Sequence, residues 1–265
     1  MKPCLSRRVL RVVCCVILLV ATLNSRAQET TNGFAFADFL LAPLRIHLLT
    51  ATNEPAAHTT LTSNDVTRIL GKVNRVWSQA GITFYLESLR IEPAANTTNF
   101  GENVKTNNDA LLRLRPESSK GTNVFHVYYL KQFGPNGICI RGINFVKDTA
   151  SLRPVEGGLD EPIPRVTSHE LGHALTLPHR QNVTNLLASG MSGGWLNEAE
   201  IKQAREAAAK FPWIQPASTL LKQADELKSS RKPAEARELF LRLQHVPLSG
   251  RERDSLLRQL ADPKK

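Results

Sequence analysis

The feature that most constrains this chain is a short segment rich in histidine. It reads T-S-H-E-L-G-H-A-L-T-L-P-H-R from Thr167 and contains His169, His173 and His179. Positions i and i+4 of a helix lie one above the other, so His169 and His173 can reach one ion from adjacent turns. Glu170 lies on the neighbouring side of that face, where its carboxylate can hydrogen-bond a metal-bound water without ligating the metal. The spacing predicts a helix that carries a metal site.

The residues around these groups are mostly apolar, as at Leu171, Ala174 and Leu175. A buried helix that carried two histidines and a glutamate by coincidence would have to bury them at a cost in free energy. His179 stands ten residues after His169, at the distance of a third ligand in the extended motif. We therefore expect one catalytic Zn²⁺ ion.

The segment HELGHALTLPH resembles the H-E-x-x-H-x-x-G-x-x-H signature of the metzincin zinc endopeptidases, in the manner of the secreted bacterial pappalysin- or matrixin-like peptidases. The resemblance covers roughly residues 40–211 and includes the order of the expected strands and helices. It implies that His169, His173 and His179 hold the zinc and that Glu170 is the general base. It also implies a protein or peptide substrate.

Two positions depart from the family pattern. Thr176 stands where the family has the glycine that turns the chain out of the helix, and a β-branched residue is strained at a positive φ. Either the turn is built differently or His179 reaches the metal less well. Leu187 stands where the family has the methionine beneath the metal, and Met191 is close by; leucine and methionine have similar volumes.

A downstream glutamate is the rival third ligand, as in gluzincins, and Glu198 and Glu200 are the candidates. Both follow Asn197 at an expected helix start, where acidic residues favour the helix dipole. The motif spacing favours His179.

Residues 1–27 have the layout of a secretory signal. Basic residues precede an apolar run over 12–23, and Ser25 and Ala27 flank Arg26 before the expected cut. The run is shorter than the roughly 20 residues that span a bilayer, so an uncleaved anchor is the weaker interpretation. We expect a secreted, periplasmic or cell-envelope protein with no transmembrane segment in its mature chain.

The net charge of +10 does not indicate nucleic acid. Residues 1–27 carry five basic groups and no acid, whereas residues 28–213 carry 18 basic and 17 acidic groups. Half of the charge therefore belongs to the expected leader, and no nucleic-acid partner is predicted.

The patterning along residues 28–213 predicts an α/β (α+β) domain with a twisted mixed sheet. We expect strands near 44–48, 82–91, 124–130 and 138–146, and helices over 63–81, from 165, and over 197–211. The fourth strand, interrupted by Gly142, is the expected edge along which a peptide pairs.

Residues 214–265 predict a helical extension with two antiparallel helices and a short third helix. One helical pair cannot bury a core alone, so a cap on the body is favoured over a module for a partner, whose nature is unknown.

The remaining histidines and the lone cysteine of the mature chain receive simpler interpretations. Cys139 is expected as a buried strand residue, and no thiol remains in a prosegment to block the zinc. The other histidines match no ligand spacing and are expected to be structural or exposed: His47, His58, His126 and His245. The rival function, suggested by Thr176 and the missing methionine, is a non-catalytic, zinc-stabilised binding protein of the cell envelope.

Overall fold

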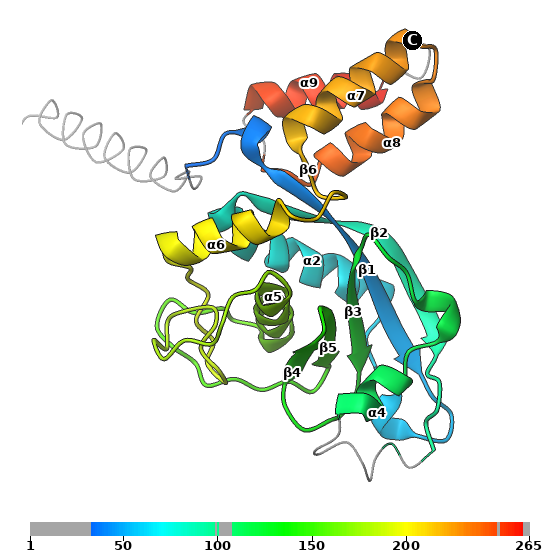
Figure 1. The fold of residues 1–265 in the computed structure, drawn as a ribbon, viewed down its shortest axis with the longest axis vertical. Helices are drawn as coiled ribbons and strands as arrows, with labels where there is room; N and C mark the ends of the chain where they lie inside the picture. Colours follow the sequence, from blue (N-terminus) through cyan, green and yellow to red (C-terminus); the bar gives the residue numbers. More distant parts are fainter. Residues whose placement is uncertain (1–32, 99, 101–107, 248–249, 262–265) are drawn as a thin grey trace, which may run out of the picture. The chain divides into compact units, whose positions relative to one another are not determined.

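A twisted mixed sheet is the scaffold of the computed structural model, which describes residues 33–98, 100, 108–247 and 250–261 (Figure 1). The strands are β1 Leu40–Thr50, β2 Ile82–Pro93, β3 Phe125–Leu130, β4 Gly137–Ile140, β5 Ile143–Lys147 and β6 Gln215–Pro216. They follow the order β2-β1-β3-β5-β4, and all of these neighbours are parallel except β4 and β5. The short β6 pairs antiparallel with the start of β1. The predicted mixed α/β architecture is confirmed.

Two of the helices begin with a capping box. Thr62 and Asp65 form one at the start of α2, Ser63–Trp77, and Asn197 and Glu200 form one at the start of α6, Glu198–Ala208. After α2 the chain passes through the 3-10 turn η3, Ser78–Ala80, to Gly81, whose φ of 59° is left-handed. The α-helices are α2 Ser63–Trp77, α4 Asn108–Arg113, α5 Pro162–Ala174, α6 Glu198–Ala208, α7 Ala217–Ser229, α8 Pro233–Leu243 and α9 Gly250–Ala261.

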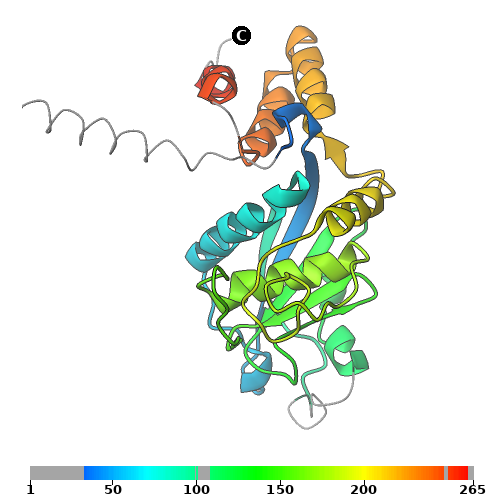
Figure 2. The same cartoon turned by 90° about the vertical axis from the view of Figure 1, so that its left-hand side faces the viewer.

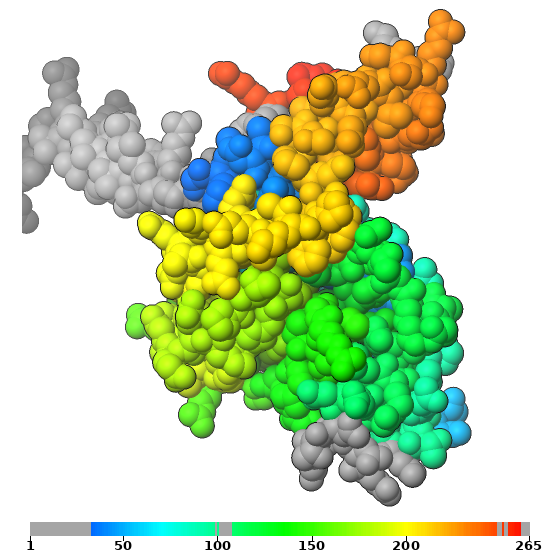
Figure 3. Space-filling view, in the orientation of Figure 1, coloured from blue at the N-terminus to red at the C-terminus, as the bar shows by residue number. Residues whose placement is uncertain are grey.

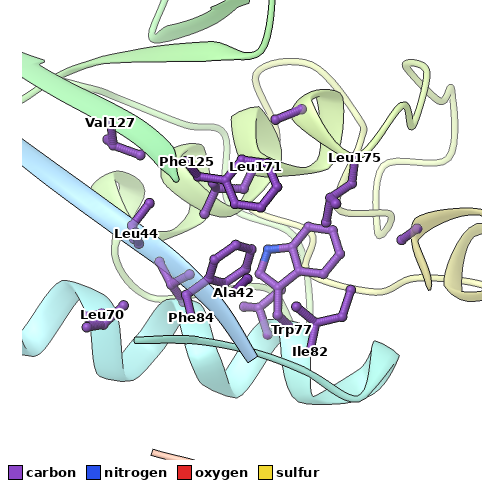
Figure 4. Close-up of a cluster of buried hydrophobic side chains, with 14 of the residues drawn as sticks. Ala42, Leu44, Leu70, Trp77, Ile82, Phe84, Phe125, Val127, Leu171 and Leu175 are labelled. Atoms are coloured by element: carbon purple, nitrogen blue, oxygen red, sulfur yellow. The ribbon is translucent and has the colours of Figure 1, made fainter. Parts of the chain in front are cut away.

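Helices α2 and α5 cover one face of the sheet (Figure 2). Alternate residues of β1, such as Leu44 and Ile46, point into the core beneath them. Trp77 at the end of α2 is fully buried in that core, near Phe84 and Leu171 (Figure 4). This core fixes α5, and thus the histidine segment, against the sheet.

One expected strand is a hairpin. We predicted one strand over 138–146, but β4 and β5 are antiparallel and joined at Arg141 and Gly142. Both residues have positive φ, 53° and 79°, so the backbone reverses there. That prediction was wrong because Gly142 was taken as an interruption of a strand, whereas the two positions form a tight turn. The sheet edge beside α5 is therefore β4 alone.

The C-terminal helices pack on the start of β1. Phe39 and Leu41 share a buried cluster with residues of α7 and α8, among them Leu220 and Phe240. Ala217 also donates its backbone N–H to the carbonyl of Phe39. Figure 3 shows this blue segment in contact with the orange helices. The third helix, α9, has 12 residues and is longer than predicted.

Among the described helices, none has the length and apolar character needed to cross a membrane. The expected signal segment, 1–27, lies outside the described residues.

Candidate metal centre

Helix α5 presents the histidine segment to the cleft side of the sheet. It begins at Pro162, earlier than the predicted Arg165, because proline at the first turn needs no N–H partner. His169 and Glu170 are buried, with only 5% and 3% of their surface exposed. A Cβ added at Gly172 would come within 3.2 Å of Leu187, so the helix packs closely there.

The structure brings the three predicted histidines together. The Nε2 atom of His173 lies 3.0 Å from the Nε2 of His169 and 3.1 Å from that of His179. Among the described residues, these three form the group of potential ligands that could hold a metal ion. The chain turn after α5 thus folds the third ring back onto the first two.

Backbone hydrogen bonds set the tautomers of two of the rings. His169 donates from Nδ1 to the carbonyl of Leu186 at 2.8 Å, and His173 donates from Nδ1 to the carbonyl of Leu177 at 2.7 Å. Each neutral ring then carries a lone pair on Nε2. Burial lowers the pKa of His169 to about 3 and also lowers the pKa of His173, so both rings stay neutral.

The Nε2 lone pairs of these rings face one another with no proton between them. Such lone pairs repel each other unless a cation lies between them. Two nitrogens bound to a tetrahedral zinc at its usual bond length lie roughly 3.3 Å apart. The observed separations of 3.0 and 3.1 Å are close to that value. The donor set, neutral imidazoles with their Nδ1 protons on carbonyl oxygens, fits a zinc ion.

Thr176 adopts the strained conformation that its position demands. Its φ is 66°, in the left-handed region. The N–H of Thr176 bonds to the carbonyl of His173, and the N–H of Leu177 bonds to the carbonyl of Gly172. This pair of bonds is the Schellman end of a helix, which glycine usually occupies. The turn is therefore built in spite of the β-branched side chain, and His179 still reaches His173.

Leu187 lies beneath the helix and is fully buried. It packs near Gly172 and belongs to the same core cluster as Trp77. Met191 is half-buried and instead pairs through its backbone with Arg153. Leucine thus fills the space under the site.

Glu170 projects into the same cleft as the three rings. Burial raises the pKa of its carboxyl to about 8, opposed by the charge of Arg165 and by a hydrogen bond from the backbone of Cys139 in β4. Cys139 itself is half-buried at the cleft, rather than buried as predicted.

The cleft has a volume of about 570 Å³ and runs between α5 and β4. Leu152, Ser189 and Gly190 line it from two loops that pair through their backbones, since Arg153 donates to the carbonyl of Gly190. A chain of peptide size can enter this open space.

The rival ligands lie elsewhere. Glu200 is fully buried at the start of α6, where its carboxylate accepts hydrogen bonds from Arg180, Asn185 and the backbone of Asn197. Glu198 is exposed in the first turn of α6. Among the described residues, neither glutamate joins the three-histidine group.

Sequence reasoning missed Arg165, which is buried behind the first histidine. Its position four residues before His169 placed it on the same helix face, and that spacing was the available signal. It also missed that His47 and His126, on the opposite face of the sheet, are buried and hydrogen-bonded to each other at 3.0 Å. Both fit the predicted structural role, while His58 and His245 are exposed as expected.

Comparisons with known proteins add little to this picture. No protein-family model matches the chain, and no curated protein does. The solved structure of archaemetzincin from Methanopyrus kandleri superposes with a TM-score of 0.42 at 12% sequence identity, covering 63% of this chain and 96% of that one. A likeness at this level says nothing about activity, which has to be argued from the side chains of the cleft.

Proposed function

We propose that this protein is a zinc-dependent endopeptidase of the metzincin kind, exported by the segment 1–27. The observation that carries the proposal is the convergence of three Nε2 atoms beside Glu170 in an open cleft bordered by a sheet edge. His169, His173 and His179 would hold one ion. A zinc ion bound there would lower the pKa of a water and polarise a carbonyl.

The edge strand β4 offers backbone groups to an extended substrate. Lys147 donates to the carbonyl of Asn136, and hydrogen-bonded pairs alternate along an antiparallel ladder. The backbone groups of Gly137 and the carbonyl of Cys139 therefore point away from β5, toward the cleft, whereas the N–H of Cys139 donates to Glu170. A peptide strand could pair with them, which orients its scissile bond along α5.

Glu170 supplies the acid–base chemistry. As a carboxylate it takes a proton from the attacking water, and as the acid it then passes that proton to the leaving amine. Burial raises the pKa of this carboxyl to about 8 in the cleft without a cation. A cation held by the three rings would lower that pKa and favour the carboxylate, the form that accepts a proton.

The test is cleavage of casein or a quenched peptide, with zinc content measured on the same samples. The wild-type protein should cleave and should lose activity to a chelator. Glu170→Ala should keep its zinc and lose cleavage, whereas Glu198→Ala, an exposed carboxylate outside the cleft, should behave like the wild type. Undiminished cleavage by Glu170→Ala would defeat the mechanism. Zinc binding without any cleavage would favour the rival, a zinc-stabilised binding protein.

Export is tested separately. The protein produced with its first 27 residues in a bacterial host should be recovered outside the cytoplasm. Sequencing of its N-terminus should place the cut near Ala27.

A further inference from the structure

Arg165 is a buried cation with an unusual set of partners. Only 1% of its surface is exposed. Its guanidinium donates to backbone carbonyls: Nε to Gly193 at 3.0 Å, and Nη2 to Ala188 at 2.5 Å and Asn185 at 3.4 Å. These acceptors belong to one segment, 185–193. A planar fork of N–H groups is suited to holding several carbonyls in a fixed arrangement.

The same segment holds the first histidine. Leu186, one residue after Asn185, accepts the Nδ1–H of His169. Nη1 of Arg165 also lies 3.2 Å from that Nδ1. Since a nitrogen that donates to Leu186 cannot also accept a hydrogen bond, the guanidinium packs against the edge of the ring. Arg165 therefore contacts both the ring and the loop that orients it.

The charge of Arg165 favours the ionised form of Glu170, but it gives no reason for tighter metal binding. A positive group beside a ligand repels the bound cation, and this effect would weaken metal binding. A benefit from Arg165 must then come from geometry. Metal ligands held by well-placed outer hydrogen bonds bind more tightly, and loss of such a bond typically costs 10- to 100-fold in affinity.

We propose that Arg165 is a positioning residue for the metal centre, because it clamps segment 185–193 so that Leu186 holds the His169 ring with Nε2 facing His173. This inference rests on the proposed function only in requiring that the three histidines bind zinc. It predicts that removing a positive charge from the site weakens cation binding, which is opposite to the electrostatic expectation.

Arg205 provides a matched control. It lies on α6 and also clamps backbone carbonyls: Nη1 donates to Ala80 and Gly81, and Nη2 donates to Asp38. None of these acceptors belongs to the segment that Arg165 holds. Arg205→Met therefore removes a comparable clamp away from the histidines.

The experiment measures the zinc dissociation constant of the full chain by competition with a chromophoric chelator, together with the thermal midpoint of the metal-free protein. Arg165→Met should weaken zinc binding 10- to 100-fold, and Arg165→Lys, which keeps the charge and loses the fork, should weaken it by a smaller factor. Arg205→Met should lower the midpoint and leave the zinc constant unchanged.

Unchanged or tighter zinc binding by Arg165→Met overturns the inference and leaves the proposed function standing. If Arg165→Met does not fold, Arg165→Lys decides: wild-type affinity in that variant overturns the inference. If Arg205→Met weakened zinc binding as much as Arg165→Met, the inference would also be overturned, because a general loss of protein stability would then explain both effects. Absence of zinc binding by the wild type defeats the proposed function and this inference together.

Discussion

The side-chain amide of Gln203 on α6 donates to the carbonyl oxygen of Thr176 at 2.6 Å. This bond joins α6 to the strained residue at the end of α5, where the chain turns toward His179. The third histidine therefore depends on a helix that contributes no ligand of its own.

Thr176→Gly should stabilise the protein by about 1 kcal/mol, because the left-handed conformation costs a β-branched residue more than it costs glycine. Gln203→Ala should destabilise it by about 1 kcal/mol through loss of one hydrogen bond. Urea unfolding measures both. A destabilised Thr176→Gly would show that the threonine side chain contributes more than its backbone strain removes.

Substitutions of Leu187 test whether side-chain volume or side-chain shape governs packing beneath helix α5. Leu187→Met should change the free energy of unfolding by less than about 1.5 kcal/mol, because the volumes are similar. Leu187→Ala should cost about 2–5 kcal/mol by leaving a cavity against Gly172. Denaturant titration distinguishes the two. A loss as large for methionine as for alanine would mean that shape, rather than volume, governs this position.

Gly137 of β4 tests the packing around Glu170. A Cβ built there would lie 2.5 Å from Cγ1 of Val166 and 2.7 Å from Oε1 of Glu170. Gly137→Ala should displace the carboxylate and lower kcat of the proposed peptidase by about 100-fold, and the proposed zinc content should stay unchanged. The control is Gly71→Ala, where an added Cβ meets nothing within 4 Å. Full activity of Gly137→Ala would show that the edge strand shifts to make room.

The buried pair of His47 and His126 should make the folded protein less stable at acid pH. Burial lowers the pKa of His47 to about 2 and lowers that of His126. The unfolded chain binds protons at both rings below about pH 6.5 while the folded chain does not, so stability is present above that pH and is lost as pH falls. Each ring lowers the free energy of unfolding by up to about 1.4 kcal/mol for each pH unit below that value.

His126→Gln removes one titrating ring and keeps an amide N–H that can donate to the carbonyl of Gly121, as Nε2 of His126 does. Unfolding measured from pH 7 to 5 should therefore show a shallower decline than the wild type. The exposed His58→Gln variant should follow the wild-type curve. Parallel curves for His126→Gln and the wild type would contradict the prediction.

Phe240 tests the attachment of the C-terminal helices. It is 1% exposed and packs in the cluster that covers Phe39 and Leu41. Phe240→Ala should cost about 3–5 kcal/mol, whereas Leu257→Ala, at a position 51% exposed, should change stability by no more than about 0.5 kcal/mol. If both variants unfold like the wild type, the helices contribute nothing to the stability of the body.

Local patterns predicted much of this structure. The capping boxes at Thr62 and Asn197 are formed by neighbouring residues, so the sequence alone located both helix starts. The spacing of His169 and His173 placed two rings on one helix face for the same reason. His179 was predicted from its motif spacing, although Thr176 argued against the necessary turn.

Contacts between distant segments escaped prediction. The carbonyls that Arg165 holds come from residues 20 to 28 positions away, and nothing in the local pattern shows where they lie. The hairpin at Arg141 was missed because a non-glycine residue with positive φ leaves a weak trace in sequence. Similarly, apolar alternation predicted β1 and a β-branched and aromatic run predicted β3, but neither pattern showed that His47 and His126 meet across these strands.

The helix end at Thr176 has a consequence for local unfolding of the protein. His173 and Gly172 supply the carbonyls that close this turn, and the turn delivers His179. Fraying of the last turn of α5 would carry one imidazole away and loosen the neighbouring one at the same moment. Under the proposed zinc binding, release of the ion and unravelling of that terminus should therefore be one event, so a chelator should speed hydrogen exchange there before it affects the sheet.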